Sequence, residues 1–468
     1  MTTYAQPTYP VSSSNEGLMG KWTDIFRSDV LVHVGIMGSI IAGTFQAYLK
    51  DRFAGPIPYA LSDGAFILAV AAWFGTLAIR REPIRGPGAT PIFIVAIILV
   101  PAFYLLHPGA PLLVRLAGLR GWSMFPVAGL MALTVIRNAA QLRAYIGLVL
   151  ILCTITAIYG IMQYAAGPEI VAAVGNLAIE RHGSSIYYTI GHSGLTGFRA
   201  YSTFTFPAPF ASMMGFGILL ATGIALSKNR ALPIRWFTAA LIPLFFMGIT
   251  VSGTRATLIN VLFGLLVVAW FRRITVAQLL LIPVAFVAFY FGSIVTAGRI
   301  LARYQTLLVQ EGLLWTYLAA PVVTAVRYLS SDPLGLGLGR TGIGVPFAIT
   351  SAMPADYFVF TDGDIGRAAV ELGIVGVILL AFVVFGLIRY IPLAARTLMG
   401  TSSEDVSLGV APLVIAAAVF LLIGSPFSSV PHGIIWWFFF GALLKLAMDR
   451  QTSLLQPATA PTAPPGDT

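Results

Sequence analysis

Residues 232–271 read LPIRWFTAALIPLFFMGITVSGTRATLINVLFGLLVVAWF. The two apolar runs in this stretch, 232–249 and 256–271, are each close to the roughly 20 residues that an α-helix needs to cross a bilayer. The turn between them is so short that Arg255 must lie near the membrane edge, at the amino-terminal end of the second helix. The stretch therefore predicts two membrane-spanning helices joined by a tight turn.

The rest of the chain repeats this pattern. Of its 468 residues, 57% are hydrophobic and 10% are charged, whereas about 25% of the residues in an ordinary soluble domain are charged. Runs of spanning length begin near Val30, Tyr59, Thr90, Gly121, Arg143, Phe206, Leu232, Ala256, Thr275, Arg367, Gly409 and Pro431. We therefore expect an all-α, polytopic helical membrane protein with about twelve transmembrane helices.

The basic residues of the short loops predict the orientation in the membrane. If the amino terminus is cytoplasmic, the clusters in the inward loops are Arg80, Arg81 and Arg85; Arg137 and Arg143; Lys228, Arg230 and Arg235; Arg272 and Arg273; Arg389 and Arg396. The short outward turns are poor in charge, which agrees with the positive-inside rule. The expected organisation is a cytoplasmic segment (1–29), a transmembrane bundle (30–297) with an outer loop (167–205), a long outer loop (298–366), further transmembrane helices (367–450) and a disordered cytoplasmic tail (451–468).

The long outer loop has charged and apolar positions at helical spacing around Arg299 and Arg303. This pattern predicts amphipathic helices along the outer membrane surface, where these two arginines could contact either anionic headgroups or a substrate. A second apolar run, 313–329, is interrupted by Pro321. It is either another surface helix or an additional short span, and a span would change the orientation of everything that follows.

Between Arg181 and Gln310 the chain contains no aspartate or glutamate. A cation beside hydrocarbon is unfavourable unless something pairs with it. Either acids from elsewhere in the chain fold back onto the basic residues of this stretch, or an anionic ligand binds them. The predicted topology accounts for those in inward loops, which are Lys228, Arg230, Arg235, Arg272 and Arg273. It leaves on the outer side Arg181, Arg199, Arg255, Arg299 and Arg303.

Among these arginines, Arg255 has the sequence context that most favours binding of an anion. Backbone N–H groups and the helix dipole already favour an anion at a helix amino terminus, and the hydroxyls of Ser252 and Thr254 are close in sequence. Arg199 has a similar setting, because Tyr201 and further hydroxyl residues follow it and another outward helix start comes next. These residues predict a phosphate cradle. The alternative is that the arginines are interfacial and extend toward lipid headgroups.

Acidic residues of the outer face gather between Asp356 and Glu371. Asp364, Arg367 and Glu371 stand at i, i+3 and i+7, so they share one face if a helix starts near Asp364. A carboxylate that is partly buried there could act as a general base. Alternatively, Arg367 and Glu371 form a structural ion pair. No histidine or cysteine joins Asp362 and Asp364, so neither a metal nor any other cofactor is expected.

A glycine-rich segment that contains Arg340, residues 331–344, lies just upstream. It lacks the Lys-Ser/Thr pair of a nucleotide-binding P-loop. We interpret it as tight loop packing near the mouth of a cavity.

Four segments stand out in their order along the chain. They are Phe198-Arg199-Ala-Tyr201-Ser-Thr-Phe-x-x-Pro207, Ser252-Gly-Thr-Arg255-Ala, Asp332-Pro-Leu-Gly-x-Gly and Asp364-Ile-Gly-Arg367-Ala-Ala-Val-Glu371-Leu-Gly-Ile-Val-Gly376. In this order they resemble the O-antigen ligase/polymerase superfamily of bacterial envelope glycan assembly. The resemblance covers residues 160–388, with a similar topology outside that range.

The resemblance implies a glycosyltransferase that acts on the periplasmic face of the bacterial inner membrane, with both termini in the cytoplasm. Its donor would be an oligosaccharide linked to polyprenyl pyrophosphate, and Arg199 and Arg255 would hold the leaving group. Transfer would be inverting and would need neither a nucleotide sugar nor a metal. Asp364, Glu371 or a loop histidine would activate the acceptor hydroxyl. Substrate contacts would come from Tyr201, Ser252, Thr254, Arg299, Arg303, Arg340 and Arg367.

The resemblance also implies which molecules the protein binds, and it bears on whether the protein is a polymerase or a ligase. The partners are the lipid-linked oligosaccharide, membrane lipids and a chain-length regulator or other glycan-assembly proteins, with no nucleic acid. The ligase branch typically has a histidine shortly before its Glu-x-Gly-x-x-Gly segment, and residues 357–371 contain none. This favours a polymerase of O-antigen, capsule or exopolysaccharide repeats over a ligase that transfers glycan to lipid A-core.

The alternative to an enzyme is a transport protein, namely a transporter or flippase of anionic or lipid-linked glycans. About twelve helices with intramembrane charges are common in such proteins. Against this alternative, the two halves of the chain contain no matching pair of glycine- or proline-interrupted segments, and the polar residues gather on one face. A non-enzymatic scaffold would tolerate substitution of Arg199 and Arg255.

Overall fold

The computed structural model describes most of the apolar segments of the chain. The described residues are 29–53, 57–81, 83–88, 90–107, 109–167, 187–190, 195–272, 313–343, 345, 353–354, 356–359, 361, 363–420 and 430–455. Five residues singled out in the sequence lie outside these ranges, as does the run that begins near Thr275: Arg181, Arg273, Arg299, Arg303 and Asp362.

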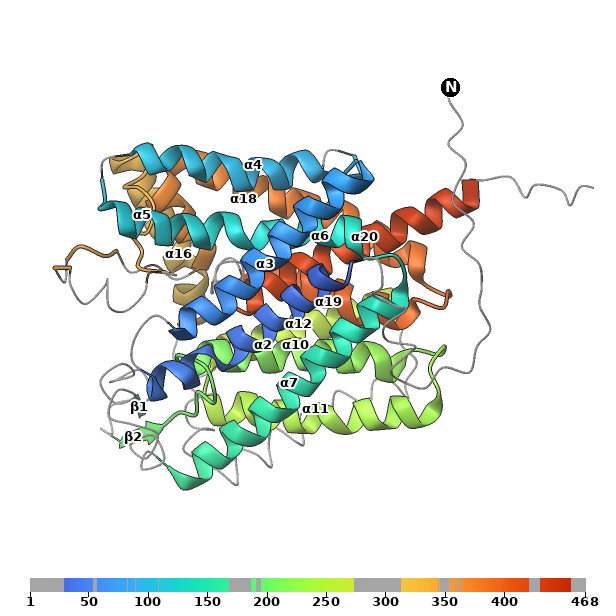
Figure 1. Ribbon diagram of the computed structural model, residues 1–468. Helices are drawn as coiled ribbons and strands as arrows, with labels where there is room; N and C mark the ends of the chain where they lie inside the picture. The colour runs from blue at the N-terminus through green and yellow to red at the C-terminus, as the bar shows by residue number, and fades with distance from the viewer. Residues whose placement is uncertain are drawn as a thin grey trace, which may run out of the picture.

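Helices make up nearly all of the described structure (Figure 1). In chain order the elements are α2 (Val30–Arg52), α3 (Ile57–Arg80), α4 (Thr90–Phe103), the 3-10 helix η1 (Tyr104–Leu106), α5 (Leu112–Leu119), the π-helix η2 (Arg120–Met124), α6 (Phe125–Val135), α7 (Ala139–Ala166), β1 (Tyr187–Ile190), β2 (Leu195–Phe198), α10 (Pro207–Leu226), α11 (Leu232–Ser252), α12 (Arg255–Arg272), α16 (Leu313–Ser331), α18 (Gly363–Leu398), α19 (Glu404–Phe420) and α20 (His432–Leu455). Within the described ranges, β1 and β2 are the strands, and they pair antiparallel.

Eight segments of the described helices are long and apolar enough to cross a membrane. They are Val30–Lys50, Ala60–Arg80, Leu112–Val135, Ala139–Ala166, Pro207–Leu226, Leu232–Ser252, Arg255–Arg272 and Gly363–Leu398. Together with exposed large apolar side chains such as Ile79 and Phe103, they confirm the prediction of a helical membrane protein. The count of about twelve spans stays a prediction. The second apolar run of the long loop forms α16, which is not one of the eight.

The helices run back and forth between two ends of the bundle (Figure 1). We call the end with the β1–β2 hairpin, α5 and α16 the outer end, and the opposite end the inner end. The centre is made by α10 and by residues 432–447 of α20, whose side chains are mostly buried. Glycines allow close approach here, because a Cβ atom on Gly223 of α10 would lie 2.2 Å from the backbone nitrogen of Gly409 in α19.

Acids and arginines that are distant in sequence pair at the inner end. Asp405 at the start of α19 accepts hydrogen bonds from Arg143 (3.0 Å) and Arg230 (2.7 Å), and Glu404 lies 3.6 Å from Arg272. Arg80 and Arg137 similarly pair with Asp29, the residue before α2. Acids from elsewhere in the chain therefore do fold back onto Arg230 and Arg272 of the acid-free stretch. The arginines of these pairs lie at one end of the bundle, and the side of the membrane that they face stays a prediction.

A break in α18 shapes the outer end. Gly373 has φ 59° and ψ −143°, which is not helical, and Ile374 resumes the helix with its N–H donated to the carbonyl oxygen of Pro333 (2.9 Å). A Cβ atom at position 373 would lie 2.1 Å from that oxygen, so only glycine fits. The glycine-rich loop after α16 thus packs directly against the break. The residues of α18 before the break, 363–372, form a short outer segment that carries Asp364, Arg367 and Glu371.

Candidate functional site

The two predicted arginine motifs meet at the outer end of the bundle. The guanidinium of Arg199 donates from Nε to the carbonyl oxygen of Ser252 (2.9 Å) and from Nη2 to the hydroxyl of Thr254 (3.1 Å). These acceptors belong to the turn between α11 and α12, and Arg255 is the first residue of α12. Arg199 and Arg255 are thereby held at one turn, although more than fifty residues separate them in sequence. We call residues 199 and 252–255 the arginine turn.

The conformation of the arginine turn explains its sequence. Gly253 has φ 61°, a left-handed conformation that glycine adopts without strain. The hydroxyl of Ser252 donates to the carbonyl of Ile249 (2.7 Å) and accepts from the N–H of Thr254 (3.2 Å). Ser252 is fully buried, so its observed contacts shape the turn, while a direct contact with substrate stays a prediction.

A glutamine that the sequence did not indicate anchors the segment after Arg199. The side-chain oxygen of Gln163, near the end of α7, accepts the backbone N–H groups of Tyr201 (2.9 Å) and Ser202 (2.8 Å). The hydroxyl of Thr203 donates to the carbonyl of Thr44 in α2 (2.8 Å). Tyr201, a predicted substrate contact, is 3% exposed and packs in the interior. The segment is therefore fixed to two helices before it reaches α10.

The electrostatics of the arginine turn favour an anion. The amino terminus of α12 presents backbone N–H groups and the positive end of the helix dipole. Arg199 and Arg255 add two guanidinium groups, which can each form paired hydrogen bonds to a phosphate. Arg199 is oriented by bonds to the turn, so its position is set before any ligand binds.

A second cluster forms where the outer segment of α18 meets η2. Glu371 is 0% exposed, and one of its oxygens accepts from Trp122 Nε1 (2.7 Å) and from Arg367 Nε (3.2 Å). The other oxygen accepts from the hydroxyl (2.5 Å) and the backbone N–H (3.3 Å) of Thr341. The structural ion pair considered from the sequence is thus present. Because both oxygens of Glu371 are occupied, its observed contacts support a positioning role, and its role as a base stays a prediction.

Arg367 is also enclosed, with 1% exposure. Its guanidinium carbon lies 4.7 Å from the centre of the Trp122 ring, and Nη2 approaches the carbonyl of Gly118 at 3.4 Å. The guanidinium fits because position 121 is glycine, where a Cβ atom would lie 2.7 Å from Nη2. Arg367 therefore joins α18 to the α5–η2 segment.

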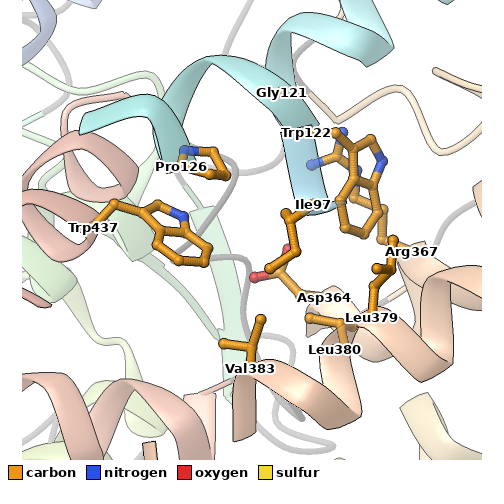
Figure 2. Close-up of a pocket in the computed structure, with 10 residues that line it drawn as sticks. All are labelled: Ile97, Gly121, Trp122, Pro126, Asp364, Arg367, Leu379, Leu380, Val383 and Trp437. Carbon is orange, nitrogen blue, oxygen red and sulfur yellow. The ribbon is translucent and has the colours of Figure 1, made fainter. Parts of the chain in front are cut away.

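The remaining carboxylate of the cluster, Asp364, lines a recess. Figure 2 shows its side chain directed between Ile97 and Trp437, with Trp122 and Arg367 to one side. The recess is small and partly open, and it is lined by Ile97, Gly121, Trp122, Pro126, Asp364, Arg367, Leu379, Leu380, Val383 and Trp437. Asp364 is 2% exposed. A carboxylate among apolar and aromatic side chains can accept the proton of a hydroxyl group that reaches it.

The other predicted residue of the outer end, Arg340, lies next to Thr341 in the glycine-rich loop. Its guanidinium carbon lies 4.1 Å from the centre of the Tyr357 ring. Within the described part of the chain, no three His, Cys, Asp or Glu side chains are placed to hold a metal ion.

A scan against models of protein families finds none that matches this chain, and a search of curated proteins finds no match either.

Proposed function

We propose that this protein is a membrane glycosyltransferase of the O-antigen ligase/polymerase type. It polymerises, or transfers, oligosaccharide repeat units from polyprenyl-pyrophosphate carriers in O-antigen, capsule or exopolysaccharide assembly. In this proposal the chain spans the bacterial inner membrane with about twelve helices. Both termini are cytoplasmic, and the outer end faces the periplasm.

The observation that supports this proposal most is the arginine turn. The guanidinium of Arg199 is bonded to the turn from which α12 begins at Arg255, at the end of the bundle where a lipid-linked pyrophosphate would lie in this proposal. A departing pyrophosphate carries several negative charges, and preorganised donors that stabilise such charge typically change a rate by about 10²–10³-fold each. The arrangement would perform the task that a metal ion performs in other phosphate-dependent transferases.

The proposed reaction is a single displacement at the anomeric carbon of the donor. The acceptor hydroxyl oxygen forms a bond to that carbon, and the bond from the carbon to the pyrophosphate oxygen breaks, with its electron pair leaving on the pyrophosphate. The acceptor's proton moves to a carboxylate. We assign that carboxylate to Asp364, because its side chain lines the recess.

The test is glycan elongation in vesicles that contain the protein and a lipid-linked oligosaccharide. With equal amounts of protein, Arg199→Ala and Arg255→Ala should each lower elongation by roughly 10²–10³-fold. Arg199→Lys should also impair it, because an ammonium group cannot form the paired bonds of a guanidinium. Arg235→Ala is the matched control, since Arg235 donates to the carbonyl of Ala225 near the inner end. Normal chain lengths in both alanine variants of the turn would refute the proposal.

A further inference from the structure

The guanidinium of Arg340 differs from the other partly buried arginines of the described structure. Arg120 and Arg230 donate hydrogen bonds to carboxylate oxygens, and Arg115, whose Nε atom also has no partner, donates from Nη1 to a carbonyl oxygen. Arg340 is partly buried and its Nε atom is inaccessible to solvent, but that atom has no hydrogen-bond partner. Its observed contact is the ring of Tyr357, which covers one face of the guanidinium at 4.1 Å. The edge of the guanidinium, where its N–H donors lie, is therefore not used by the described residues.

Two hydroxyl groups in the nearby segment 356–361 are likewise buried without a hydrogen-bond partner. The hydroxyl oxygens of Tyr357 and Thr361 are both buried, and neither has a hydrogen-bond partner. Buried donors are normally bonded, and groups that are not bonded within the chain are candidates for binding a ligand. Arg340, Tyr357 and Thr361 thus bring three kinds of hydrogen-bond donor to one short stretch of the outer end.

The backbone holds these side chains in place. The carbonyl oxygen of Arg340 accepts from the N–H of Val359 (2.8 Å), which ties the glycine-rich loop to the segment that carries Tyr357. The next residue, Thr341, is 5% exposed and bonds to Glu371. Arg340 is therefore fixed on both sides, and little conformational freedom would be lost when a ligand binds.

The chemistry of the three groups favours an oxyanion. A guanidinium whose face is stacked on an aromatic ring still presents two parallel N–H bonds, which match the two oxygens of a carboxylate or of a phosphate ester. Hydroxyl groups such as those of Tyr357 and Thr361 also donate to oxyanions. No described aspartate or glutamate forms an ion pair with Arg340.

We propose that Arg340, Tyr357 and Thr361 form an oxyanion-binding site at the outer end, separate from the arginine turn. The site takes a carboxylate or a phosphate ester, which an acidic sugar or a phospholipid headgroup could supply. The proposal does not depend on glycosyl transfer, because it concerns binding to residues outside the arginine turn and the recess.

Titration calorimetry of the purified full-length protein in a neutral detergent tests the site. The probes are glucuronate, its neutral counterpart glucose, and phosphatidylglycerol in mixed micelles. The wild-type protein should bind at least one of the two anions and should not bind glucose. Tighter binding of glucuronate would identify an acidic sugar as the source of the anion, and tighter binding of phosphatidylglycerol would identify a headgroup.

Substitutions connect this binding to the named residues. Arg340→Gln should weaken anion binding about tenfold or more, because the paired charge-assisted bonds are lost. Arg340→Lys, which keeps the charge, is the second variant if Arg340→Gln does not fold, and it should also bind more weakly than the wild type. Tyr357→Phe keeps the stacked ring and removes the hydroxyl, so it should weaken binding to a smaller extent.

Arg327→Gln is the matched control. It removes the same charge from an exposed position of α16 at the outer end and should leave anion affinity unchanged. Equal affinity for glucuronate and glucose, without binding of phosphatidylglycerol, would overturn the proposal. So would equal effects of Arg340→Gln and Arg327→Gln.

Discussion

Replacement of Glu371 by alanine should destabilise the protein strongly. The change leaves the guanidinium of Arg367, which is 1% exposed, without its carboxylate, and it removes the acceptor of Trp122 Nε1 and of Thr341. Breaking a buried ion pair by removing one partner typically costs about 3–5 kcal/mol, because the other charge stays buried. A buried indole N–H without a partner adds to this loss. We therefore expect a loss of at least about 3 kcal/mol for Glu371→Ala.

The structure offers a matched control for this experiment. Lys445 and Asp449 form a second i, i+4 ion pair at 2.5 Å, but the aspartate side chain is 44% exposed. Exposed pairs contribute about 0–1 kcal/mol, so Asp449→Ala should change stability little. The assay is thermal unfolding of the purified protein in detergent, followed by tryptophan fluorescence. If Glu371→Ala lowers the unfolding midpoint no more than Asp449→Ala does, the assignment of Glu371 as a buried structural anchor is wrong.

Three further predictions concern the break in α18, the topology and the recess. Gly373→Ala should destabilise the protein by about 1–3 kcal/mol or more, because its Cβ atom would collide with a loop carbonyl oxygen and the backbone has a positive φ. Gly386→Ala, in the same helix but with open space around the position, should be tolerated. The single cysteine of the chain is buried, so cysteines introduced by Ser330→Cys and Lys228→Cys should react with an impermeant maleimide from opposite sides of the membrane. Asp364→Asn should lower glycan elongation by roughly 10²–10⁴-fold while it perturbs the melting midpoint less than Glu371→Ala does.

Each of these predictions can fail in a recognisable way. Equal melting midpoints for the two glycine variants would mean that the break in α18 is not sterically required. Labelling of both introduced cysteines from the same side would contradict the two-ended arrangement of the bundle. Unchanged elongation by Asp364→Asn would remove this carboxylate from the mechanism.

Features that depend on local sequence could be predicted, because length and hydrophobicity determine whether a segment can span a bilayer. The turn at Arg255 and the i, i+4 pair of Arg367 and Glu371 follow from such local spacing. The break at Gly373 could not be predicted, because a glycine in an apolar run is also tolerated inside a helix and the cause of the break is a contact with a distant loop.

Long-range partners could not be predicted from one sequence. Trp122 bonds to a carboxylate 249 positions away, and nothing in its own segment indicates this contact. Gln163 likewise is a lone polar residue in an apolar helix, and it gains its role only when the segment after Arg199 packs against it. The sequence did indicate that Arg199 and Arg255 share a setting, but the bonds that join them through the turn required the fold.

The most direct test of the proposed function is the release of the lipid carrier. The purified protein, reconstituted in liposomes with a synthetic polyprenyl-pyrophosphate-linked oligosaccharide and a metal chelator, should release one polyprenyl pyrophosphate for each glycosidic bond that forms. Release and elongation should be lost together in Arg199→Ala and in Arg255→Ala. Movement of the intact lipid-linked oligosaccharide across the bilayer without any release of carrier would contradict the proposal and identify a transporter.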